Sequence, residues 1–457
     1  MRLLTILGLA ALVLSLAAAT PAAAQQLLDS LATAYANNPQ LRAARAQLRA
    51  VDEQVPQALS GWRPTIAIQG QVGTEAIKTD TPQTESNRYG LDPRGVDLTI
   101  TQPLYQGGRT VAATSAAENN VRAQRALLLA TEQSILLSSV QAYMDVVRDT
   151  AVLQLTINNE QVLRRDLEAT RDRFNVGEVT RTDVAQAEAA LALAIAQRIQ
   201  AAGNLTSSRA RYTEFIGDPP VNLVSPPPPI KLLPANEGET VAGSVNNPDV
   251  ISAQYVERAA RDQVDVAFGQ MLPSASLVGT LSRGTDTSNV KDLTVNSASI
   301  IAQVTIPLYQ AGNPDSQVRQ AKQTAGQRRL EIDQQRRSAV QNATTAWQQL
   351  STARSQIVSF QAQVKANTIA LEGVRQEAQV GARTVLDVLD AEQTLLQSQV
   401  NLVGAQHDEI VACYSVLAAV GRLTARNLGL KVSYYDPESH YKQVRDKWWG
   451  IGGGEKE

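Results

Sequence analysis

The chain is poor in aromatic, cysteine and histidine residues. Phe, Trp and Tyr make up 4% of its 457 residues, and it has one cysteine and two histidines. A single cysteine, Cys413, excludes an internal disulfide, and its apolar neighbours predict a buried core residue. His407 and His440 are far apart in sequence and suggest no metal cluster, and His407 beside Asp408 is expected at the surface. We expect no enzyme, no catalytic residue, no metal and no cofactor.

The net charge is small, and long apolar runs are scarce. The net charge of −2 offers no basic surface to a nucleic acid. Only the N-terminus is strongly apolar: Arg2, the run from Leu3 to Ala19 and the small residues after it are typical of a signal peptide, so residues 1–24 are predicted to be cleaved. A retained N-terminal anchor is the alternative. Because no later run reaches about 18 apolar residues, we expect no spanning helix, and such a chain could cross a membrane only in a closed β-barrel.

The chain contains one long internal repeat. The triplet Asn-Asn-Pro at 37–39 recurs at 246–248, and Pro64 recurs as Pro273, both 209 residues later (248 − 39 and 273 − 64). The sequence Pro-Leu-Tyr-Gln at 103–106 recurs at 307–310, and Val-Gly at 176–177 recurs at 380–381, both 204 residues later (307 − 103 and 380 − 176). The offset between the copies thus falls by five residues between Pro64 and Pro103, which predicts an insertion in a loop there. Two long copies indicate an internally duplicated fold.

Each copy predicts helix, strand, loop, strand, long helix, tight turn and helix. The first copy, 25–217, has strands at about 63–74 and 95–105 and a helical hairpin at about 107–217 with its tip near 175–182. The second copy, 243–422, has strands at about 273–282 and 297–309 and a hairpin tip near 379–385. A proline-rich linker, 218–242, separates the copies. Residues 423–457 form a tail whose role the sequence does not reveal.

The four strands alternate apolar and polar residues. In the first strand Ile66, Ile68 and Val72 alternate with Thr65, Gln69 and Gln71. Such alternation over about ten residues is typical of outer-membrane strands, with a soluble half-buried hairpin as the alternative. Four strands cannot close a barrel, so several chains must share one. The polar loops 75–94 and 283–296 are expected to face outward, and the aromatic residues at the opposite corners suit a membrane interface: Trp62, Tyr105 and Tyr309.

Two proline-free segments, 107–173 and 316–377, predict very long helices. At 1.5 Å per residue, about 65 residues would span roughly 100 Å. A helix of that length has no compact core to cover, so we expect it to pack lengthwise on other helices.

The hairpin tips carry the most specific signals. Gly177 and Gly381 are suited to end a helix, and Thr180 with Asp183, like Thr384 with Asp387, predicts a capping box. Asp390 is different, because its counterpart in the first copy is Gln186 and capping does not account for it. It lies three residues after Asp387, on the same helix face.

These tips resemble those of the TolC-like outer-membrane efflux protein family. The resemblance rests on RFNVG at 173–177 followed by TDV at 182–184, on VGARTVLDVLDAE at 380–392, on both PLYQ corners and on the duplication, and it covers essentially the whole mature chain. It implies a mostly α fold with a membrane β-barrel: a homotrimer whose protomers each give four strands to a twelve-stranded barrel and long helical hairpins to a periplasmic α-helical barrel.

The resemblance also implies a function. The chain would be a passive exit duct in the cell outer membrane, surrounded by lipid, spanning into the periplasm and serving efflux or type I secretion. A periplasmic adaptor (membrane fusion) protein and an inner-membrane transporter of the RND or ABC type would open it. The alternative is a periplasmic coiled-coil adaptor or binding module without a channel. No motif identifies the cargo.

Site residues carried over from the family all lie at the tips. Asp387 and Asp390 match the acidic ring of the periplasmic gate, and Thr182, Asp183 and Arg383 match the gate latch. The family's latch also uses a tyrosine where this chain has Ala378, so the latch is expected to differ in detail. Capping alone would explain Asp183 and Asp387, and Arg383 could be a solvated tip residue. We expect the adaptor to dock at Val176, Gly177, Val380 and Gly381.

Overall fold

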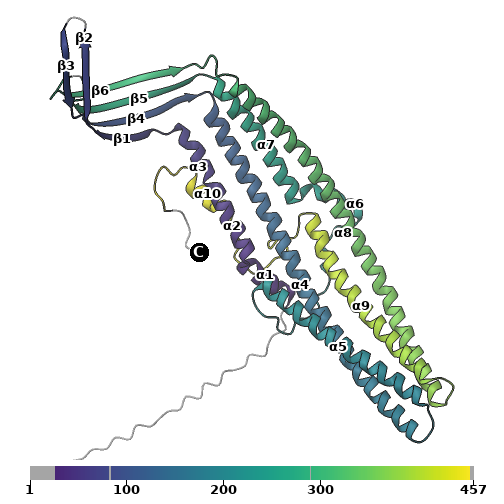
Figure 1. The fold of residues 1–457 in the computed structure, drawn as a ribbon. Coiled ribbons are helices and arrows are strands. Elements are labelled where there is room, and N and C mark those ends of the chain that lie inside the picture. Colours follow the sequence, from purple (N-terminus) through teal and green to yellow (C-terminus); the bar gives the residue numbers. More distant parts are fainter. Residues whose placement is uncertain (1–25, 82–83, 289, 453–457) are drawn as a thin grey trace, which may run out of the picture. The chain divides into compact units, whose positions relative to one another are not determined.

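The computed structural model describes residues 26–81, 84–288 and 290–452 (Figure 1). The predicted signal peptide lies outside these residues. None of the helices described is long and apolar enough to cross a membrane. The chain divides into two compact units. The first unit comprises the chain up to Ala34, Ser138–Pro228 and Ala353–Val411, and the second comprises Tyr35–Leu137, Pro229–Thr352 and the chain from Ala412.

The first copy of the repeat has ten elements. They are the helices α1 (Leu27–Asn37), α2 (Pro39–Asp52) and α3 (Gln54–Leu59), the 3-10 turn η1 (Ser60–Trp62), the strands β1 (Thr65–Val72), β2 (Glu75–Thr81), β3 (Thr84–Leu91) and β4 (Arg94–Gln106), and the helices α4 (Arg109–Asn175) and α5 (Arg181–Ile216).

The second copy follows the linker with a similar order. Its elements are η2 (Ile230–Leu232), α6 (Glu237–Gly243), η3 (Ser244–Asn246), α7 (Pro248–Phe268), η4 (Gly269–Met271), β5 (Ser274–Thr285), β6 (Thr294–Thr305), α8 (Asn313–Gln379) and α9 (Val385–Ala419), followed in the tail by α10 (Ser439–Val444).

The repeated Asn-Asn-Pro triplet starts a helix in both copies. The side chain of Asn38 accepts hydrogen bonds from the backbone N–H of Gln40 and Leu41, at 2.9 and 3.3 Å. Asn247 does the same for the N–H of Asp249, at 2.9 Å. The proline that follows each cap occupies the first helical turn, where its missing N–H costs nothing.

Four strands form one antiparallel sheet in the order β1-β4-β5-β6. The central pair joins the two copies, with Thr99 of β4 opposite Thr280 of β5. Strand β1 pairs with β4 through Thr65 opposite Thr101, and β6 pairs with β5 through Ser299 opposite Thr280. Within the described part of the chain, β1 and β6 each have one edge without a partner strand. The four predicted strands are therefore present and neighbours in one sheet.

The segment 75–94 differs from the prediction of a loop. It contains β2 and β3, which form a separate two-stranded sheet with Glu75 opposite Leu91. This hairpin lies where the offset between the copies changes by five. Its threonine-rich strands have β-propensity but no regular apolar face, so the alternation that revealed the other four strands could not reveal these two.

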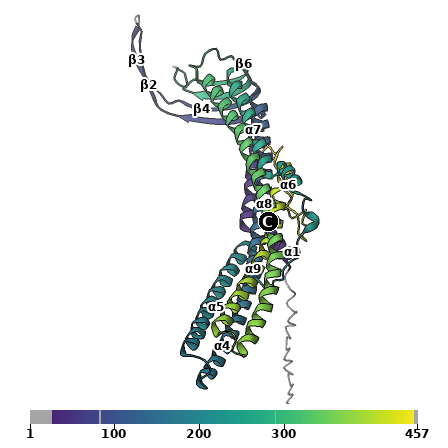
Figure 2. The same ribbon diagram turned by 90° about the vertical axis from the view of Figure 1, so that its right-hand side faces the viewer.

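Small residues fill the cores of both units. In the second unit, α8 packs on α9 through a buried cluster of Ala343, Ala346, Leu350, Ala412, Cys413, Val416 and Ala419. Cys413 is fully buried, as predicted. In the first unit the two hairpins, α4–α5 and α8–α9, lie side by side (Figures 1 and 2), and Leu163, Ala194 and Leu389 meet from three of their helices. Alanine allows close approach of long helices, as their composition predicts.

The corner between β4 and α4 yields a first prediction. Gly107 and Gly108 both have a left-handed backbone, with φ of 61° and 75°. A Cβ on Gly107 would collide with the carbonyl oxygen of Gly269 and lie 2.9 Å from the Cβ of Leu272, whereas a Cβ on Gly108 would meet nothing within 4 Å.

We expect Gly107→Ala to lower the free energy of unfolding by more than about 2 kcal/mol, because the collision adds to the cost of about 1–2 kcal/mol for the left-handed backbone. Gly108→Ala is the matched control, because it meets the cost of the left-handed backbone but no steric collision. Ala311 occupies the position of Gly107 in the second copy with a φ of 51°, so an alanine can adopt the left-handed backbone at this corner. Denaturant titration followed by circular dichroism would measure both, and equal losses would contradict the collision argument.

Candidate functional site

The two hairpin tips have the same backbone. After α4 the chain turns at Gly177, with φ of 86°, and after α8 it turns at Gly381, with φ of 78°. The N–H of the next residue then bonds back to the helix, from Glu178 to the carbonyl of Arg173 and from Ala382 to that of Glu377, both at 2.9 Å. Val176 and Val380 project from these turns with 72% and 81% of their surface exposed. Each tip thus presents an apolar side chain on a fixed turn.

Both predicted capping boxes are present. The carboxylate of Asp183 accepts hydrogen bonds from the N–H and hydroxyl of Thr180, at 2.7 and 2.8 Å, and the N–H of Asp183 donates to that hydroxyl oxygen at 3.3 Å. Asp387 and Thr384 repeat the pattern at 2.9, 2.8 and 3.2 Å. The hydrogen bond from the backbone of the threonine is the main reason that the pKa of each carboxyl is lowered. Both aspartates are therefore fixed anions at a helix start.

The other predicted gate residues are differently placed. Arg383 pairs with Glu377 of its own tip, at 2.8 Å, and both side chains are about half exposed. Asp183 and Arg383 line one open cleft between the hairpins, of about 550 Å³, but Thr182 is exposed and not part of the cleft wall. Asp390 is also exposed, and its side chain has no hydrogen bond or ion pair within the described residues. The single chain brings together Asp183 and Arg383 without a direct bond between them.

Asp166 and Arg375 also line the cleft, and the sequence analysis missed both. Arg375 of α8 pairs with Glu392 of α9, whose side chain is 8% exposed. Burial raises the pKa of Glu392 despite Arg375. Burial also raises the pKa of Asp166, whose Oδ2 has no hydrogen-bond partner in the described structure. One guanidinium thus stands near two carboxyl groups that resist ionisation.

The pair Arg375–Glu392 has a counterpart in the first hairpin. Arg171 bonds to Glu188 at 2.6 Å, and both lie 204 positions earlier (375 − 171 and 392 − 188). That pair is about half exposed. The matching charges at the repeat offset, on both sides of a turn, were a signal in the sequence that could have predicted both pairs.

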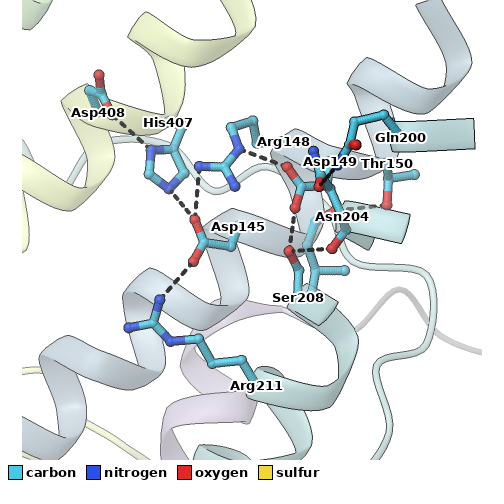
Figure 3. A network of polar contacts seen from close by, with 11 residues as sticks. Asp145, Arg148, Asp149, Thr150, Gln200, Asn204, Ser208, Arg211, His407 and Asp408 are labelled. Carbon is cyan, nitrogen blue, oxygen red and sulfur yellow. Dashed lines mark hydrogen bonds and ion pairs between the residues drawn. The ribbon is translucent and has the colours of Figure 1, made fainter. Parts of the chain in front are cut away.

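A second polar network, farther from the tips along the helices of the first unit, joins the hairpins (Figure 3). His407 of α9 lies between Asp145 of α4, with Nε2 to Oδ1 at 3.0 Å, and Asp408, with Nδ1 to Oδ1 at 2.9 Å. Asp145 also pairs with Arg148 at 3.0 Å and with Arg211 of α5 at 3.4 Å. The expectation of a surface histidine was wrong, because only 12% of the His407 side chain is exposed.

The geometry at His407 favours the charged ring. Both ring nitrogens face carboxylate oxygens, and only the imidazolium has an N–H on each nitrogen. Burial is the largest single effect on the ring and favours the neutral form, but the hydrogen bonds to Asp145 and Asp408 outweigh it, so the pKa of His407 is raised above 6.5. For Asp145, burial likewise opposes the charge, but the hydrogen bond from His407 and the positive charge of Arg148 outweigh burial, so the pKa of Asp145 is lowered.

The predicted interface aromatics lie at one end of the four-stranded sheet in the second unit. Trp62 closes the turn before β1 and is 39% exposed, and its carbonyl accepts a hydrogen bond from Gln102 at 2.9 Å. Tyr105 is the second-last residue of β4 and is 45% exposed, and Tyr309 follows β6 and is 86% exposed. Among the described residues there is no cluster of His, Cys, Asp and Glu that could hold a metal ion.

Comparisons with known proteins agree with this geometry. The family model for outer membrane efflux proteins matches residues 30–218 and 244–422. The outer membrane efflux protein BepC of Brucella suis is 37% identical over 436 residues, covering 94% of this chain and 92% of BepC. The outer membrane protein TolC of Vibrio cholerae is 27% identical over 423 residues, covering 90% and 95%.

A solved structure shares the fold. The CmeC outer membrane channel of Campylobacter jejuni is similar with a TM-score of 0.78 and 19% identity, covering 92% of this chain and 89% of that one. The predicted fold class is confirmed: mostly helical, internally duplicated, with four strands in one sheet and two long helical hairpins in each chain.

The two Arg–Glu pairs allow a matched test of burial. We expect Arg375→Gln to lower the free energy of unfolding by about 2 kcal/mol, because it leaves the buried carboxyl of Glu392 without its cation. Arg171→Gln should cost less than about 1 kcal/mol, because exposed pairs contribute little. Denaturant titration at neutral pH would measure both variants, and an equal loss would show that burial of Glu392 is not what matters.

His407 generates a prediction about pH. Because its folded pKa is raised, its contribution to stability is complete below pH 6.5 and is lost as the pH rises through the folded pKa. His407→Gln keeps hydrogen-bonding capacity but cannot become charged. We therefore expect the melting temperature of the unmodified protein to exceed that of the variant most at pH 6 and progressively less at higher pH. If the difference in melting temperature between the two proteins does not change with pH, His407 is not protonated as proposed.

Proposed function

This chain belongs to the outer membrane efflux protein family and is an outer-membrane exit duct, and from that premise we propose how its own residues assemble and gate the channel. It is located in the outer membrane, extends into the periplasm and acts as a passive channel rather than an enzyme. The alternative of an adaptor without a channel is set aside by membership of the family.

The protein assembles as a homotrimer. The observation that carries this proposal is the pair of unpartnered sheet edges, since exposed edges template pairing with another strand. Strand β6 of one copy would pair with β1 of the next, so that three copies give twelve strands. Ile66, Ile68 and Val304 are 65–73% exposed in the single chain, and they would face outer-membrane lipid.

Exposed apolar residues on the helices support the same assembly. In the first unit Leu193, Ile199, Val358 and Ile369 are 53–69% exposed, at positions on α5 and α8. Helices of neighbouring copies would cover them and form the periplasmic helical barrel, since patches of apolar side chains mark interaction surfaces.

The periplasmic gate is formed by the carboxylates at the second tip. The capping box holds Asp387 in place, and Asp390 lies exposed one helical turn further on. Threefold symmetry would set six carboxylates around one axis, where their mutual repulsion attracts cations. Thr182, Asp183 and Arg383 form the latch. Because Arg383 pairs with Glu377 inside one chain, this bond competes with any latch contact and makes opening easier.

The tips are the docking surface for the partners. A periplasmic adaptor would contact the exposed Val176 and Val380 beside Gly177 and Gly381. Through the adaptor, an inner-membrane transporter of the RND or ABC type supplies the energy. Trp62, Tyr105 and Tyr309 fix the level of the sheet at the periplasmic interface of the membrane. Both drug efflux and type I secretion use such a duct.

Single-channel recording in planar bilayers tests the gate. We expect a small cation-selective conductance that a trivalent cation blocks, and we expect Asp390→Asn to weaken the block by about tenfold, which corresponds to about 1.4 kcal/mol of binding free energy. Asp387→Asn should also weaken it, but with a loss of helix capping that lowers the melting temperature.

Glu178→Gln at the first tip is the matched control, since it removes an exposed tip carboxylate that is assigned neither to the ring nor to the latch. Equal block of the unmodified protein and Asp390→Asn would keep the channel and remove Asp390 from the gate. Absence of any conductance from a folded trimer whose tips have been loosened by Arg383→Ala would contradict the proposed duct.

A further inference from the structure

The chain beyond α9 returns to the start of the sheet. Within the second unit, α10 is fixed on α2 and α4: His440 bonds to Asp52 at 3.2 Å, Arg445 bonds to Glu118 at 3.3 Å, and Tyr441 packs against a buried cluster of Val51, Val55, Ala117 and Val121. The tail is therefore a folded part of this unit up to α10.

The residues after α10 are tied to the corner between helix and sheet. Arg63, which follows Trp62 and lies two residues before the start of β1, donates a hydrogen bond to the carbonyl of Lys447 at 2.7 Å. Its guanidinium also lies 5.1 Å from the ring centre of Trp448. Two contacts thus hold the end of the tail at the level where the membrane sheet begins.

The side chains beyond these contacts are large, apolar and uncovered. Trp448 is 68% exposed, Trp449 is 90% exposed and Ile451 is fully exposed. Leaving such large apolar side chains in water is unfavourable relative to burying them. Tryptophan is enriched where one part of the ring is in hydrocarbon and the N–H is in a polar layer.

The charges nearby suit a phospholipid surface. Lys442 and Arg445 are paired with Glu438 and Asp446. Arg63 and Lys447 have no acidic partner within the described residues: Arg63 lies over the ring of Trp448, and the ammonium of Lys447 donates a hydrogen bond to the carbonyl of Gly452. Cations without an acidic partner next to interfacial aromatics complement anionic headgroups.

We propose that residues 448–451 are a tail anchor that inserts into the headgroup region of the periplasmic leaflet of the outer membrane. Arg63 links the anchor to the turn at Trp62, just before β1 begins, so we infer that its occupant is lipid rather than a protein partner. It would fix the height of the duct in the membrane independently of the strands. The proposal rests on the location of the sheet in the outer membrane.

Depth-dependent fluorescence quenching tests the anchor. The chain has four tryptophans, Trp62, Trp347, Trp448 and Trp449, and replacing three of them by Phe gives a protein with one reporter. Full-length trimers would be reconstituted into vesicles of phosphatidylethanolamine and phosphatidylglycerol with bromine either near the glycerol or deep in the acyl chains. We expect the Trp449 reporter to lose intensity with the shallow bromine and much less with the deep one.

Matched reporters set the scale. Trp62 should be quenched to a similar extent as Trp449, and Trp347 of α8 should keep its intensity with both lipids. If Trp449 behaves as Trp347 does while Trp62 is quenched, the anchor is wrong and the outer-membrane location stands. Protection of Trp449 from both bromine and aqueous acrylamide would indicate burial against another protomer and also overturn it. Loss of quenching at Trp62 would instead call the placement of the sheet into question.

Discussion

The unpaired outer edges of β1 and β6 are the constraint on which the rest of the architecture depends. A backbone N–H or C=O that faces hydrocarbon without a partner costs several kcal/mol, so a sheet in a membrane must be closed. One chain supplies four strands and cannot close the sheet itself. The same strands expose Ile66 and Ile300 by 67% and 78%. Assembly therefore satisfies two requirements of the single chain, hydrogen bonding at the edges and covering of apolar side chains.

Duplication explains how one chain supplies an even set of strands, and also how its two hairpins came to differ. Each hairpin has an ion pair between its two helices, Arg171–Glu188 in the first copy and Arg375–Glu392 in the second, but only Glu392 is buried. Nearer the tips the charges are exchanged, since Arg173 pairs with Glu178 while its counterpart Glu377 pairs with Arg383. The backbone of the turn is thus conserved between the copies, while the electrostatics of the second tip have changed.

Local interactions were predictable from the sequence, and distant ones were not. The capping boxes at Thr180 and Thr384 involve residues three apart, so their spacing alone identifies them. The four strands of the large sheet are predictable because one face is apolar, whereas β2 and β3 lack that pattern. His407 and Asp145 are 262 residues apart, and no local pattern links them. The contact of Arg63 with Lys447 was missed for the same reason.

The cores of the two units differ in a way that bears on opening. The second unit holds α8 to α9 through a continuous set of buried small and apolar residues, and separating them would expose that surface to water. In the first unit, the cross-hairpin contacts include a small apolar cluster, the Asp166–Arg375–Glu392 group and the His407 network. When helices separate so that both partners become hydrated, hydrogen bonds and ion pairs contribute little net free energy, because water replaces the lost contacts. Water can therefore replace the polar contacts between the hairpins of the first unit, whereas it cannot replace the apolar packing of α8 on α9 in the second.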